Sequence, residues 1–145
     1  MEELIVRYIH FVGIMLLTAT LVAEHLLITS EMSIQQLKRV AIIDTIYGIS
    51  AMVVLAAGLL LWFSVGKPAE FYTKNGLFHA KITLFIVIAL LSIYPTVFFL
   101  KQKKSAQSTI TIPKSILMVI RTELLLLLMM PLLAVFMARG YGLAQ

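Results

Sequence analysis

The sequence contains no cysteine and few charged residues. Without cysteine, the protein cannot form a disulfide, a thiolate metal site or a cysteine nucleophile. Only 13% of the residues are charged, against about 25% in soluble domains, and 61% are hydrophobic. The sequence also lacks a phosphate-binding glycine loop, a His-Glu-x-x-His zinc motif and a nucleophile elbow. The absences argue against a soluble enzyme, and the composition indicates an integral membrane protein.

Four apolar runs dominate the chain, and each is close to the length of about twenty residues that a bilayer-spanning helix requires. They cover residues 4–28, 40–63, 77–100 and 115–137, and the connections between them are too short to fold alone. We therefore predict an all-α protein, an integral membrane four-helix bundle, with one transmembrane domain over residues 1–145.

Basic residues differ between the two sides of the predicted bundle. The first and third connections lie on one side and contain Lys38, Arg39, Lys101, Lys103, Lys104 and Lys114. The other side contains Arg7, Lys67, Lys74 and Arg139. Cytoplasmic loops carry an excess of Lys and Arg, so we expect both termini on the periplasmic side of a bacterial-type inner (plasma) membrane. This bias, together with anionic lipid head groups, accounts for the excess of basic residues without nucleic-acid binding.

Ionisable residues interrupt the apolar runs. A charge inside a spanning helix costs a few kcal/mol, so such residues usually face a polar interior with a function. Once the helix directions are assigned, they fall into two layers of similar depth. The outer layer contains Arg7, His10, His79, Lys81 and Arg139. The inner layer contains Glu24, His25, Asp44, Arg121 and Glu123.

His10 and His79 are the candidate metal ligands of the outer layer. Two neutral imidazoles from different helices at one depth are the ligands that six-coordinate haem b needs, and bundle cores commonly hold such sites. The basic residues Arg7 and Lys81 lie close to them in sequence and are candidates to bind the haem propionates. The alternative is that each histidine hydrogen-bonds a backbone carbonyl or a carboxylate. Both histidines begin helices of one direction, which hints at a parallel pseudo-repeat.

The inner layer has two interpretations. In the first, Arg121 pairs with Glu24, Asp44 or Glu123 in a buried ion-pair network that fixes helix packing. In the second, at least one member has a functional role, since apolar packing would hold the helices more simply. His25 lies near the interface, where snorkelling or a salt bridge competes with a role in a proton relay.

Two short segments resemble a known family. Arg7-Tyr8-Ile9-His10-Phe11 resembles the Lys-x-x-His-Ile start of the HemJ-type protoporphyrinogen oxidases, four-helix membrane proteins that bind haem b. Phe78-His79-Ala80-Lys81 is similar to the His-x-Lys start of that family's third helix, and Gly58 with residues 59–62 to the end of its second. Arg121 and Glu123 resemble its fourth-helix Arg…Glu pattern loosely. The resemblance implies this scaffold, in that family or in a sister family.

The resemblance implies a haem b-binding membrane redox protein that oxidises protoporphyrinogen IX and passes electrons to quinone. Its partners would then be membrane lipid, quinone and a porphyrin substrate, and so small a bundle also allows a homodimer. The residues assign no catalytic group. Two alternatives stay open: a non-haem proton-coupled small transporter that uses Glu24, Asp44, Arg121 and Glu123, and a structural membrane subunit.

A reporter fused after Gln145 tests the predicted orientation. Because both termini are expected outside the cytoplasm, alkaline phosphatase, which needs export for activity, should be active there. The same reporter inserted into the connection between the third and fourth spans should be inactive. Activity of a cytoplasm-specific reporter alone at Gln145 would contradict the orientation and the two depth layers derived from it.

Overall fold

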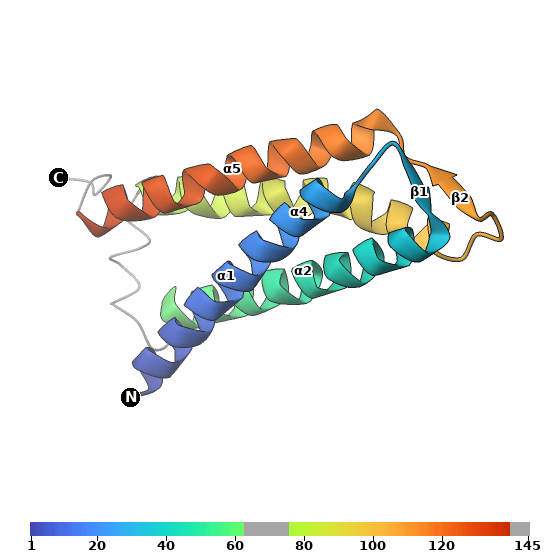
Figure 1. Cartoon of the computed structure of the whole chain (residues 1–145). Helices are drawn as coiled ribbons and strands as arrows, with labels where there is room; N and C mark the ends of the chain where they lie inside the picture. The colour runs from blue at the N-terminus through green and yellow to red at the C-terminus, as the bar shows by residue number, and fades with distance from the viewer. Residues whose placement is uncertain (63–75, 140–145) are drawn as a thin grey trace.

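The structure, a computed structural model, describes residues 1–62 and 76–139. This part of the chain contains four long helices, α1 (Glu2–Leu27), α2 (Ile34–Leu60), α4 (Gly76–Gln102) and α5 (Lys114–Ala138). All four are long and apolar enough to cross a membrane, so the prediction of an all-α membrane bundle is confirmed (Figure 1). Phe63, the end of the second expected span, lies outside the described residues, as do Lys67 and Lys74.

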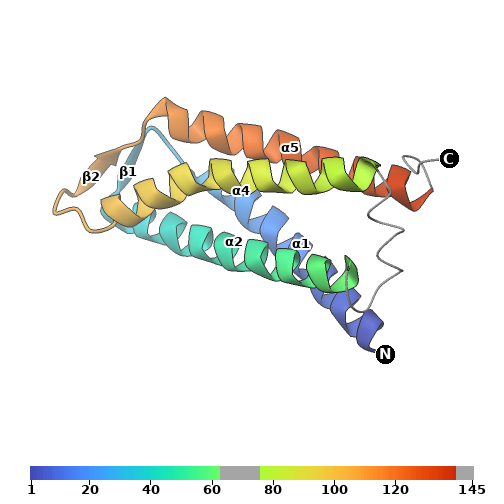
Figure 2. The same ribbon diagram turned by 180° about the vertical axis from the view of Figure 1, so that it is seen from behind.

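A pair of short strands closes one end of the bundle. Strand β1 (Glu31–Ser33) follows α1, strand β2 (Thr109–Thr111) follows α4, and the two pair antiparallel with Met32 opposite Ile110. Both of these side chains are buried. Figure 2 shows the strands at the opposite end of the bundle from the N-terminus. The sequence did not predict this pair, because three residues are too few for a recognisable alternating pattern.

The order of elements repeats a helix–strand–helix unit, first as α1–β1–α2 and then as α4–β2–α5. Within each unit the two helices pack along each other, and the units meet through α2 against α4 and α1 against α5. Helices α1 and α4 therefore lie diagonally opposite each other. The pseudo-repeat of the two histidine segments stays a prediction, because the order of elements does not test their similarity.

Helices α1 and α2 approach closely at Gly13. A Cβ atom at this position would lie 2.9 Å from Cγ2 of Val54, so either the Val54 side chain or the helices would have to shift. Small residues allow such contacts between membrane helices. The first turn of α2 is fixed by a capping box, in which Ser33 Oγ accepts from the Gln36 N–H and the Gln36 side chain accepts from the Ser33 N–H. Both features set the direction of α2, which lines the core from end to end.

Candidate functional site

Three carboxyl side chains lie in the core of the bundle. Glu24 comes from α1, Asp44 from α2 and Glu123 from α5, and their exposed fractions are 1%, 4% and 1%. Each continues the 3–4 spacing of the buried residues on its own helix, as Glu24 does three residues after Leu21. The same apolar pattern that builds the core therefore turns these acidic side chains into it.

Close approach and one hydrogen bond connect the carboxyl cluster, by which we mean Glu24, Asp44 and Glu123. Glu24 and Asp44 lie close enough to interact directly. Thr96 of α4 donates from Oγ1 to Asp44 Oδ2 over 2.6 Å. Glu123 lies close enough to Asp44 for a direct electrostatic interaction. Side chains from all four helices thus meet at one place.

Tyr47 is the central hydroxyl of the site. It lies three residues after Asp44 on the same face of α2, and only 2% of it is exposed. It lies within electrostatic range of the three carboxyls and close to the Ser92 side chain of α4. Tyr47, Ser92 and Thr96 were not predicted from the sequence, although the Asp44–Tyr47 spacing could have identified the tyrosine. The two hydroxyl residues of α4 had no comparable signal, because isolated Ser and Thr are common in membrane helices.

Two oxygens of the carboxyl cluster have no hydrogen-bond partner among the described residues, namely Oε1 of Glu24 and Oε1 of Glu123. No ion pair joins Glu24, Asp44 or Glu123 to a basic side chain in the same part of the chain. A buried polar atom without a partner usually costs about 1–3 kcal/mol, and more when it is charged. The cluster therefore concentrates acceptors without supplying enough donors for them.

Arg121 and His25 lie outside the carboxyl cluster. Arg121 is exposed and its Nε donates to His25 Nε2 over 3.3 Å. The predicted ion pairs of Arg121 with the three carboxyls do not form. The physical reason is helical geometry: two residues correspond to about 200° of rotation, so Arg121 and Glu123 project from opposite sides of α5. The inner layer consequently separates into a buried acidic group and a surface Arg121–His25 pair.

His10 is held in the outer half of the bundle by α2. Its Nδ1 lies 3.1 Å from the carbonyl oxygen of Val54, and since a carbonyl can only accept, Nδ1 carries the proton. The ring lies against Gly58, where a Cβ atom would be 3.4 Å from His10 Cε1. Lys81 of α4 is within electrostatic range of the imidazole. The hydrogen bond to a backbone carbonyl leaves Nε2 as the nitrogen able to bind a ligand.

Among the other residues of the outer layer, His79 and Arg139 are exposed and Arg7 is half-buried. Arg7 Nη2 forms an ion pair of 2.6 Å with Glu3 Oε1, one turn earlier in α1. His79 lies in the first turn of α4 and is exposed, and its carbonyl accepts from Thr83 Oγ1. His10 and His79 therefore come from two helices, α1 and α4, that lie diagonally opposite each other in the bundle.

Among residues 1–62 and 76–139, no group of three or more His, Asp or Glu side chains is placed to hold a metal ion. The arrangement in the core can nevertheless bind, share and release protons, because carboxyl and phenol groups both accept and donate them.

Comparison with known proteins places the chain in a family. The family model described as "Predicted membrane protein (DUF2214)" matches residues 2–142, so the chain belongs to this family. No curated protein matches it significantly. No solved structure does so either.

Replacing Thr96 by Val tests the hydrogen bond that ties α4 to the carboxyl cluster. The variant keeps the shape of the side chain but leaves Asp44 Oδ2 without this donor, which should lower the free energy of unfolding by about 1–3 kcal/mol. Thr122→Val is the matched control, because the exposed Thr122 hydroxyl bonds only a carbonyl of its own helix. Denaturant unfolding in detergent micelles measures both. Equal effects of the two variants would show that the Thr96–Asp44 bond contributes little.

Proposed function

We propose that this member of a membrane-protein family is a proton-coupled small transporter, in which Glu24, Asp44 and Glu123 bind and release protons inside the bilayer. The observation that carries the proposal is the burial of three carboxyls from three helices without a basic partner among the described residues. Ionisable groups of this kind inside membrane proteins characteristically mark proton relays and substrate pathways.

Electrostatics supports a role for protons. Glu24 and Asp44 lie close enough to interact directly. Ionising both would place like charges side by side in a medium of low polarity, which costs several kcal/mol per ion. Proton release would therefore push apart α1, α2 and α5, because the carboxyls lie where these three helices pack together. Such a coupling between charge and helix position is what a proton-driven carrier needs.

Further polar groups continue from the cluster toward the opposite end of the bundle. Along the buried face of α2, Asp44 is followed by Tyr47 and then by Ser50, at steps of three residues. One turn later the Val54 carbonyl accepts from His10. This series gives hydroxyl and imidazole groups between the acidic cluster and the outer half of the bundle. It supports a proton route along α2 that ends at His10.

Infrared difference spectroscopy can detect the proposed proton exchange. A change of pH across the titration of the cluster should alter the band of protonated carboxyl groups in the full-length protein in lipid. Glu24→Gln and Glu123→Gln keep the side-chain size and should each remove part of this signal. In proteoliposomes with an imposed pH gradient, the same variants should slow proton flux by at least about tenfold, as expected when a proton-transfer group is lost.

Glu31→Gln provides the control, because Glu31 is an exposed carboxyl in β1. This variant should keep both the infrared signal and the proton flux. If the wild-type protein shows no titrating carboxyl band, or if Glu31→Gln removes as much signal as Glu24→Gln, the carboxyls only hold the helices together and the proposal is wrong.

A second candidate function is haem b binding, which the geometry of His10 favours. Histidines that bind metals usually donate their other ring N–H to a carbonyl or carboxylate, as His10 does to Val54. In this proposal His10 and His79 are the axial ligands. Lys81 and Arg7 would bind the propionates, although Arg7 is already paired with Glu3. The haem would supply one-electron chemistry. Protoporphyrinogen IX as substrate and quinone as electron acceptor are the specific form that the HemJ-type resemblance implies.

An absorbance spectrum tests haem binding directly. Protein purified from haem-supplemented cells should show a Soret band and a sharp reduced α-band. His10→Ala and His79→Ala should abolish or convert this low-spin spectrum. His25→Ala should leave it intact, since His25 is fifteen residues further along α1, about 22 Å at 1.5 Å per residue. A folded and colourless protein would contradict haem binding without affecting the proton-transport proposal.

A further inference from the structure

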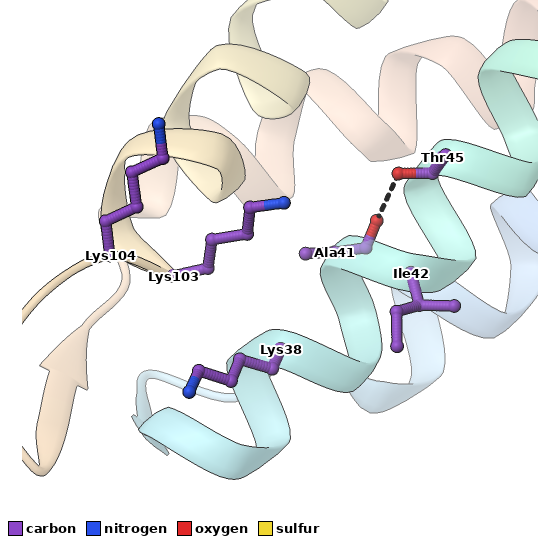
Figure 3. Close-up of a pocket in the computed structure, with 6 residues that line it drawn as sticks. All are labelled: Lys38, Ala41, Ile42, Thr45, Lys103 and Lys104. Atoms are coloured by element: carbon purple, nitrogen blue, oxygen red, sulfur yellow. Dashed lines mark hydrogen bonds between the residues drawn. The ribbon is translucent and has the colours of Figure 1, made fainter.

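A basic pocket lies at the strand end of the bundle, between the start of α2 and the end of α4. The cavity measures about 360 Å³. Its lining residues are Lys38, Ala41, Ile42, Thr45, Lys103 and Lys104 (Figure 3). Two helices that are adjacent in space but distant in sequence thus bring three lysines to one cavity.

The charge of this pocket is uncompensated. Within the described residues, none of the ammonium groups of Lys38, Lys103 and Lys104 has a carboxylate or hydrogen-bond partner. The Thr45 hydroxyl is already engaged, because it donates to the Ala41 carbonyl over 3.0 Å. Lys103 extends from the end of α4 toward α2 (Figure 3). An anion in the cavity would therefore be bound by lysine side chains and would relieve the repulsion among them.

The position of the pocket combines this charge with an apolar wall. Lys38 lies four residues after the start of α2, and Lys103 directly follows the last residue of α4. Both lysines are therefore at the ends of membrane-spanning helices, where the head groups of the lipids lie. Ile42, one turn further into the span than Lys38, is 61% exposed. A ligand in this place meets positive charge at the head-group level and a hydrocarbon surface just beneath it.

We propose that this pocket binds the phosphate head group of an anionic phospholipid, with an acyl chain against Ile42. Basic pockets between membrane helices commonly bind such head groups. A soluble phosphate compound would use the lysines but would have no use for the exposed Ile42 beside them. A phospholipid thus matches both the lysines and the exposed Ile42, and its binding would bridge α2 and α4.

Native mass spectrometry of the full-length protein can test the site. We expect phosphatidylglycerol to bind more tightly than phosphatidylcholine by at least about tenfold, since each lysine near an anionic lipid contributes about a fivefold gain in affinity. The variant with Lys38→Gln, Lys103→Gln and Lys104→Gln should lose most of this preference. Circular dichroism and gel filtration check that the variant is folded, and all three positions are at the surface.

A charge-matched variant serves as the control. Arg39→Gln, Lys101→Gln and Lys114→Gln remove the same charge from the same end of the molecule, but none of these residues lines the pocket. This variant should keep the preference within about twofold, because only the pocket lysines contact the lipid. Equal losses in both variants would show a diffuse electrostatic attraction and overturn the site. Displacement of the lipid by millimolar inorganic phosphate would also overturn it, in favour of a soluble anion.

Discussion

The burial of Glu24, Asp44 and Glu123 in one core constrains the rest of the structure. Inside a bilayer there is no water to solvate a charge, so each carboxyl must be protonated, hydrogen-bonded or paired. The described residues supply one hydroxyl donor to Asp44, from Thr96, and no basic partner to any of the three. The fold therefore brings Glu24 and Asp44 together without a basic partner among the described residues, which helix packing alone would not require. A protein that needed only four stable helices would use leucines at these positions.

The repeated helix–strand–helix unit explains how the carboxyls come together. Antiparallel pairing of β1 with β2 fixes the ends of both units against each other, so the depth of α2 relative to α5 is set by the strands. Asp44 lies ten residues after Ile34, the first residue of α2, and Glu123 nine residues after Lys114, the first residue of α5. With the strands in register, these similar distances place both carboxyls at nearly the same depth. Glu24 of α1 lies at the same depth. The close contact between α1 and α2 depends on Gly13.

Hydropathy and charge predicted the four spans and the similar depth of Glu24, Asp44 and Glu123, because both depend on sequence position alone. The partners around each helix were harder to predict. Arg121 was expected beside the carboxyls, yet it lies on the other side of α5 from Glu123 and contacts His25 instead. The depth of a residue in the membrane follows from its position along the helix. Which face of the helix points into the core depends on the helices that pack against it. For the same reason, Tyr47 and Thr96 were not predicted to lie at the site. The two strands were not predicted because three residues are too few to show an alternating pattern. The assignment of His10 and His79 as haem ligands stays a prediction. The hydrogen bond to the Val54 carbonyl supports it for His10.

Helices α2 and α4 carry both proposed sites, and this links the bundle core to the membrane surface. The Asp44–Thr96 hydrogen bond joins the two helices inside the core, and the lysine pocket lies between the start of α2 and the end of α4. Lys103 lies seven residues after Thr96, about 10 Å along a helix. An anion that draws Lys38 and Lys103 together would shorten the distance between the same helices that hold Asp44. Conversely, loss of the proton from the carboxyl cluster would favour wider spacing of the helices around it. Lipid head groups and bound protons would then act on these helices in the same direction, so anionic lipid would favour the protonated, closely packed state.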